Sequence, residues 1–165
     1  MDAAGPGAVV RFWSANPKEG GIVRFYLDHA EEPVIEMPLY VFLSGTTKPF
    51  IAPISGERGK GWNCYMPIPY AEHCKITLSE GDIYYHINYR TYASGTPATS
   101  FSFAQAEALA PQIRAMARAL DAPFDAVSAP GGMKSPYTAF VDAGRSESLF
   151  ISGPGAINSI TCQVK

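Results

Sequence analysis

The chain has 165 residues, 13 of them Lys or Arg and 15 Asp or Glu, and a formal net charge of −2. With 47% apolar and 17% charged residues it has the composition of a globular protein rather than a disordered one. Without a Lys/Arg cluster there is no electrostatic basis for binding nucleic acid or an anionic membrane. No apolar run approaches the ~18–20 residues needed to span a bilayer.

The first two thirds of the sequence consist of short apolar or alternating segments separated by turn residues. These segments are Ala8–Ala15, Gly21–Asp28, Pro33–Leu43, Gly61–Tyr70, Lys75–Leu78 and Asp82–Tyr92, with a Gly/Pro-rich loop at Ser44–Lys60. In the second segment Val23, Phe25 and Leu27 alternate with other residues, which is typical of a half-buried strand. Pro38 interrupts the third segment and fits only a sheet edge or a bulge.

A helical pattern interrupts these strands at Ser102–Asp121, where apolar residues recur with a period of 3.6. Ser102 and Gln105 form a capping box, and Pro111 is expected to kink or split the helix. Further candidate strands are Tyr137–Val141, Ser148–Ile151 and Ala156–Val164. Many short strands with one helical insertion, at about 102–121, predict an all-β jelly-roll sandwich.

The sequence Gly-Pro-Gly-Ala occurs twice, at 5–8 before the first strand and at 153–156 before the last. The expected organisation is therefore a jelly-roll module at 1–152. Residues 153–165 are then either its last strand or the truncated start of a second jelly roll. The N-terminus lacks the basic start and apolar centre of a signal peptide, so the compartment stays open.

The candidates for catalysis are carboxylates, because glycoside chemistry usually needs two Asp or Glu flanking one bond. They are Asp28, Glu31, Glu32, Glu36, Glu72 and Asp82. Solvated charge in a turn is the favoured interpretation of Glu31 and Glu32, a turn cap that of Asp28, and a surface position that of Glu36. The three Cys and three His have neither a metal-site nor a disulfide spacing. Neither a catalytic residue nor a metal ligand is assigned.

Aromatic residues beside polar ones are the remaining candidates for chemistry, because sugars stack their C–H faces on rings and bond polar groups through their hydroxyls. The candidate substrate-binding residues are Trp13, Asn16, Trp62, Tyr65, His86 and Asn88. For Trp13 and Trp62 core packing is the alternative interpretation. His86 and Asn88 share one face of the strand Asp82–Tyr92 and are expected to line a groove.

Several segments together, in their order along the chain, resemble the domain-of-unknown-function family 2961. They are Val10–Pro17, Arg24–Asp28, Pro33–Glu36, Met66–Tyr70 and Tyr84–Tyr89. Carbohydrate-active members of that family form glycoside hydrolase family 172, which includes α-D-fructofuranosidase and difructose dianhydride-forming enzymes. The resemblance implies paired jelly rolls, cyclic oligomers and retaining cleavage of fructofuranosyl or related glycosides by two Glu. It implies neither a metal nor an organic cofactor.

The family's two glutamates lie in motifs resembling Gly-Glu-Gly-Asp-Glu and Gly-Thr-Glu-Asp-Tyr-Phe, and neither motif occurs in this sequence. The chain is therefore expected to be the N-terminal jelly-roll portion of a larger family-172-like protein, inactive alone. A carbohydrate ligand and a homo-oligomer are expected. Two alternatives stay open: a non-catalytic carbohydrate-binding module, and a jelly roll for structure or oligomer assembly.

Overall fold

The structure is a computed structural model and describes residues 1–121, 139–150 and 152–153. The chain divides into two units, Met1–Ala122 and Pro123–Lys165. All helices and strands of the described residues lie in the first unit. No helix among the described residues has the length and apolar character needed to cross a membrane.

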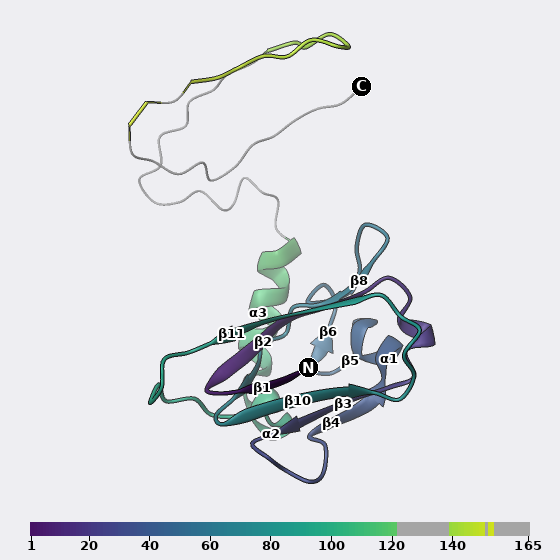
Figure 1. Cartoon of the computed structure of the whole chain (residues 1–165), viewed down its shortest axis with the longest axis vertical. Helices are drawn as coiled ribbons and strands as arrows, with labels where there is room; N and C mark the ends of the chain where they lie inside the picture. The colour runs from purple at the N-terminus through teal and green to yellow at the C-terminus, as the bar shows by residue number, and fades with distance from the viewer. Residues whose placement is uncertain (122–138, 151, 154–165) are drawn as a thin grey trace. The chain divides into compact units, whose positions relative to one another are not determined.

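The first unit is a sandwich of two antiparallel sheets that lie face to face (Figure 1). Sheet A contains, in spatial order, β1 (Asp2–Ala4), β10 (His73–Leu78), β3 (Ile22–Leu27) and β4 (Ile35–Pro38). Sheet B contains β11 (Tyr85–Thr91), β2 (Gly7–Ser14), β8 (Trp62–Cys64) and β7 (Ser55–Glu57), and β9 (Ile68–Tyr70) also pairs with β2. The predicted all-β sandwich is confirmed.

The remaining elements complete the unit. They are η1 (Pro17–Glu19), α1 (Leu39–Leu43), the hairpin of β5 (Thr46–Thr47) and β6 (Phe50–Ile51), α2 (Phe103–Ala108) and α3 (Ala110–Asp121). The predicted cap is present, since the Oγ of Ser102 accepts a hydrogen bond from the backbone N–H of Gln105 at 3.2 Å. The predicted split is present too, because α3 begins one residue before Pro111.

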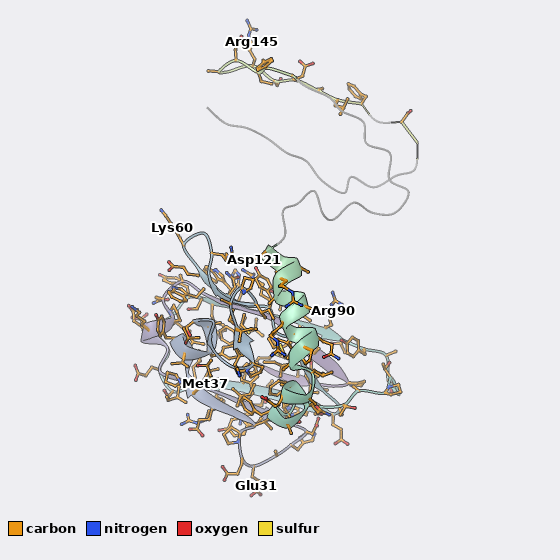
Figure 2. The ribbon with its side chains drawn as sticks, turned by 180° about the vertical axis from the view of Figure 1, so that it is seen from behind. Glu31, Met37, Lys60, Arg90, Asp121 and Arg145 are labelled. Atoms are coloured by element: carbon orange, nitrogen blue, oxygen red, sulfur yellow. The ribbon has the colours of Figure 1, made fainter. Side chains whose placement is uncertain are left out.

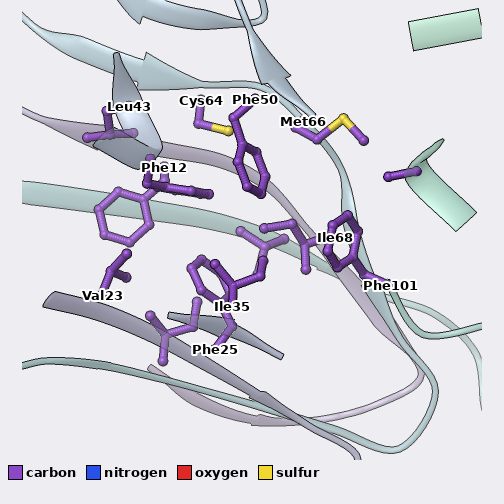
Figure 3. Close-up of a cluster of buried hydrophobic side chains, with 14 of the residues drawn as sticks. Phe12, Val23, Phe25, Ile35, Leu43, Phe50, Cys64, Met66, Ile68 and Phe101 are labelled. Carbon is purple, nitrogen blue, oxygen red and sulfur yellow. The ribbon is translucent and has the colours of Figure 1, made fainter. Parts of the chain in front are cut away.

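The core lies between the two sheets and follows from the alternation along their strands (Figure 3). In β3 Val23, Phe25 and Leu27 are buried and the residues between them are half-buried, as the alternation predicts. Phe42 of α1 meets aromatic rings from both sheets and from β6, with centroid separations of 5.8 Å to Phe12, 5.4 Å to Phe25 and 4.7 Å to Phe50. α1 thus closes one side of the core.

Two segments differ from the prediction. Pro33–Leu43 is a strand only as far as Pro38, which lies in β4 at the edge of sheet A, and then becomes α1. Leu39, Phe42 and Leu43 are fully buried, and their spacing of three and four residues matches one face of a helix. The loop Ser44–Lys60 contains three short strands: β5 and β6 pair with each other, and β7 pairs with β8. This pairing satisfies the hydrogen-bonding groups of the loop backbone.

In the second unit the described residues 139–150 and 152–153 contain neither helix nor strand. The predicted strands Tyr137–Val141 and Ser148–Ile151 are therefore wrong over their described parts. Phe140 and Phe150 are 95% and 93% exposed, so neither side chain has the buried face that a strand of a sandwich needs. Ala156–Val164 lies outside the described residues. The module boundary at 152 stays a prediction.

Candidate functional site

The candidate site is the outer face of sheet B, where β2 runs between β11 and β8. In the strand register Trp13 lies opposite His86 of β11 and Asn63 of β8, and Arg11 lies opposite Asn88. Directly paired residues project from the same face of a sheet. Phe12, which lies between Arg11 and Trp13 in β2, is buried in the core. The five side chains of Arg11, Trp13, Asn63, His86 and Asn88 therefore share the face that points away from the core.

Arg11 occupies the centre of this face. Its Nε donates a hydrogen bond to Oδ1 of Asn63 at 3.0 Å, and its Nη1 donates one to Oδ1 of Asn88 at 3.4 Å. The guanidinium carbon lies 5.9 Å from the centre of the ring of Tyr65, which follows β8 and is 41% exposed. Two amides and an aromatic ring therefore fix the position of a positive charge on the sheet.

Trp13 and His86 form an aromatic pair beside Arg11. Their ring centres lie 5.1 Å apart with an angle of 37° between the planes, and Trp13 is half-buried while His86 is exposed. The backbone of Gly61 comes so close to the indole that a Cβ at this position would lie 2.0 Å from Nε1 of Trp13. Only glycine allows this approach, which holds the edge of the indole against the turn between β7 and β8.

The structure thus brings together Trp13, Tyr65, His86 and Asn88 of the six residues predicted to bind sugar. Asn16 is elsewhere and joins two turns: its Oδ1 accepts from the N–H of Tyr84 at 3.0 Å, and its Nδ2 donates to Glu19 at 2.6 Å. The side-chain amide of Asn16 thus makes its hydrogen bonds within these turns and not on the outer face of sheet B. The role of all six residues in binding remains a prediction.

Trp62 lies on the opposite face of sheet B from Trp13. It is paired in register with the fully buried Ser14, and its ring packs edge-on against Tyr40 at 4.9 Å. For Trp62 the core-packing alternative is therefore the better one. The adjacent Asn63 was missed by the sequence reasoning, although the alternation of β8 signals it, because a residue next to an inward Trp must face outward.

Arg11 was missed as well. Its signal is the same alternation, since it stands two residues before Trp13 and must share its face.

The carboxylates considered for catalysis have other partners. Oδ1 of Asp28 accepts hydrogen bonds from the N–H groups of Ala71, Glu72 and His73 at 3.1, 2.7 and 3.3 Å, and Oδ2 accepts one from the hydroxyl of Ser100. Burial alone would raise the pKa of Asp28, but the bonds from Ser100 and the three N–H groups outweigh it and lower that pKa. Asp28 is therefore an anion that stabilises a turn through hydrogen bonds, in agreement with its predicted capping role.

Glu36 and Glu31 are surface groups. An oxygen of Glu36 lies 2.8 Å from a guanidinium nitrogen of Arg24, its neighbour across β3 and β4. Glu31 lies in the loop between those strands and points outward at the edge of the sandwich (Figure 2). Both positions agree with the solvent-facing interpretation.

A cavity of about 250 Å³ lies between residues of β10 and β11. Its lining includes the apolar side chains of Phe12, Ile76, Leu78 and Ile87. Glu80 is its one carboxylate. Across residues 1–121, 139–150 and 152–153, no group of three His, Cys, Asp or Glu side chains is placed to hold a metal ion.

Comparison with known families shows to which protein family the chain is similar. A family profile described as the GH172 first beta-sandwich domain matches residues 1–109, well over half of the chain. The matched region contains both sheets and α2, and with them every residue of the outer face of sheet B described above. A search of curated proteins found no match. The chain belongs to glycoside hydrolase family 172, of which residues 1–109 form the first β-sandwich domain.

Proposed function

We propose that this chain is a non-catalytic β-sandwich domain of a glycoside hydrolase that acts on fructofuranosyl or related glycosides, and that it cleaves no glycoside alone. The observation that carries the proposal is the state of its carboxylates. A glycosidase places two carboxyl groups about 5–9.5 Å apart on either side of the bond, one of them protonated. The cavity between β10 and β11 offers Glu80 alone.

Neither Asp28 nor Glu36 supplies the missing acid. Asp28 is held as an anion by four hydrogen bonds, and a group with a lowered pKa is a poor proton donor near neutral pH. Glu36 is paired with Arg24 on the outer surface of sheet A, away from the cavity. The two glutamates of the family's motifs are the groups from which we expect catalysis, and this sequence does not contain those motifs.

The test is an assay of the purified chain against p-nitrophenyl α- and β-fructofuranosides and a difructose dianhydride. A longer family member that carries both glutamate motifs is the positive control. We expect no turnover above the blank. Turnover that stays with the chain through purification and falls in Glu80→Gln would overturn the proposal.

A second candidate function is carbohydrate binding by the outer face of sheet B. It is favoured by the meeting of an aromatic pair, Trp13 and His86, with hydrogen-bonding groups on Arg11, Asn63 and Asn88. Stacking on an aromatic ring with hydroxyl contacts beside it is how proteins usually hold sugars.

Trp13→Ala tests this function, and Trp62→Phe is its matched control, because Trp62 lies in the same sheet but on the other face. Loss of the stacking ring is expected to cost ~1–3 kcal/mol of binding free energy in calorimetry with fructo-oligosaccharides and other glycans. Equal losses in both variants, or no glycan binding by the wild-type chain, would refute it.

We further propose that the chain forms a homo-oligomer through the edge of sheet B. β11 is the outermost strand of that sheet, and Tyr84, Tyr85 and Tyr89, at or within it, are 75%, 47% and 49% exposed. An unprotected edge strand is a template for pairing with another chain. Light scattering with size-exclusion chromatography should give a discrete mass above the 17.8 kDa of one chain, and a monomer at all concentrations would contradict this.

A further inference from the structure

We propose that Arg11 makes the outer face of sheet B a subsite for an acidic sugar, a pyranoside whose ring carries a carboxylate. The inference rests on the proposed carbohydrate binding by this face. It goes further by naming the charge of the ligand and the side chain that binds this charge. It is carried by the surroundings of the guanidinium rather than by those of the aromatic pair.

The guanidinium of Arg11 has no carboxylate partner among the described residues, and Arg11 is half-buried, whereas the other unpaired arginines of the described part of the chain are exposed. Arg24, the other half-buried arginine, occupies a mid-strand position in the other sheet and has Glu36 at 2.8 Å. Arg11 instead contacts two neutral amide oxygens. A half-buried positive charge surrounded by neutral groups gains most from an anion brought by a ligand.

The free part of the guanidinium is oriented for such a ligand. A guanidinium has five N–H donors, and the amides of Asn63 and Asn88 use one on Nε and one on Nη1. Asn63 is only 4% exposed, and its own Nδ2 donates to the carbonyl of Gly61 at 3.4 Å, which fixes which way its oxygen points. The other Nη1 hydrogen and both hydrogens of Nη2 remain for a planar, bidentate acceptor such as a carboxylate.

The spacing on β2 matches a sugar acid. Arg11 and Trp13 are two residues apart on one face, about 7 Å at a rise of ~3.3–3.4 Å per residue. A pyranose ring against the Trp13–His86 pair would place a carboxylate on its C5 carbon within reach of the guanidinium, with the amide of Asn88 beside it for a hydroxyl. A neutral sugar would use the rings and leave the charge without a partner.

The experiment compares oligogalacturonate with its carboxyl-reduced counterpart, which has the same sugar backbone without the charge. Calorimetry is done on the wild-type chain, Arg11→Gln, Arg11→Lys and the matched control Arg24→Gln, each shown by circular dichroism to be folded. We expect the wild type to bind the acidic oligomer at least tenfold more tightly than the reduced one. Arg11→Gln should lose that preference, Arg11→Lys should keep part of it, and Arg24→Gln should keep all of it.

Salt separates charge recognition from stacking. Raising NaCl from about 50 to about 500 mM should weaken binding of the acidic oligomer and leave binding of the neutral one nearly unchanged.

Three other results would each overturn the inference. If the acidic and neutral oligomers bind with the same affinity and Arg11→Gln changes neither affinity, the face binds sugar without recognising its charge. The proposed carbohydrate binding then survives. If neither oligomer binds although fructo-oligosaccharides do, the ligand is neutral and of another class. If no glycan binds and Arg11→Gln changes the mass of the assembly in solution, the guanidinium faces a carboxylate of a second protein surface, and both proposals fail.

Discussion

Asp28 provides the sharpest test of how this sandwich is held together. The residue follows β3 directly, in a left-handed conformation with φ of 53°, and its carboxylate joins the turn between β9 and β10 to Ser100. The substitution Asp28→Asn removes the charge and keeps the shape. Asn also tolerates positive φ, so the backbone adds no cost of its own.

The magnitude follows from the hydrogen bonds. Bonds to a charged acceptor stabilise by about 1.5–3 kcal/mol and bonds to a neutral one by about 1 kcal/mol. In the variant the amide oxygen still accepts from the N–H groups of Glu72 and His73, and the amide nitrogen can donate to Ser100. The loss is therefore the charge assistance, and Asp28→Asn should lower the free energy of unfolding by about 1–2 kcal/mol at pH 7.

The pH dependence identifies the cause. Because the pKa of Asp28 is lowered below its ordinary value of 3.8, its contribution is fully present above that pH and disappears as pH falls through the lowered folded-state pKa. Urea unfolding followed by tryptophan fluorescence should give a wild-type advantage at pH 7 and pH 5 that shrinks progressively as the pH falls below 3.8. Glu31→Gln, in an exposed loop, is the control and should change stability by less than about 0.5 kcal/mol. A wild-type advantage that is the same at pH 7 and pH 3 would refute the reasoning.

Three further predictions concern the core, the outer face and the thiols. Phe42→Ala removes the ring that meets three other aromatic side chains and should cost about 3–5 kcal/mol in urea unfolding. Gly61→Ala places a methyl group 2.0 Å from Nε1 of Trp13, so it should displace the indole, shift the fluorescence emission and weaken any sugar binding. Burial raises the pKa of Cys64 to about 11 and that of Cys74 to about 12, so mass spectrometry should find both unlabelled by iodoacetamide at pH 8 until urea unfolds the chain.

Gly61→Ala has a control variant, and each of the three predictions has a result that would contradict it. Gly59→Ala, in the same turn, meets no atom within 4 Å but has φ of 57°, so it should cost about 1 kcal/mol and leave the indole in place. A fluorescence shift as large in Gly59→Ala as in Gly61→Ala would contradict the steric argument. A loss below about 1 kcal/mol for Phe42→Ala would mean that the aromatic cluster is not tightly packed. Labelling of either thiol in the native chain would show that its site opens without global unfolding.

The correct structural predictions came from patterns whose interactions involve residues only a few positions apart in the sequence. The alternation in β3 places Val23 and Phe25 in the core because successive side chains of a strand point to opposite faces. The cap of α2 follows from Ser102 and Gln105 alone, since the hydroxyl and the backbone N–H that it binds are three residues apart. α1 was missed because five apolar residues after Pro38 fit a strand and a helix equally well by composition.

The sequence by itself determined the all-β class and the family, because short segments in a fixed order along the chain carry both. It also showed that neither of the two glutamate motifs expected from the family resemblance is present. Only the tertiary structure decided which predicted binding residues meet. Trp13 and Trp62 are each followed by a polar residue, yet the register of β2 and β8 puts Trp13 on the outer face and Trp62 against Tyr40. The same register gives Arg11 two amides in place of a carboxylate, because strand pairing joins residues 52 and 77 positions apart whose contact no local pattern records.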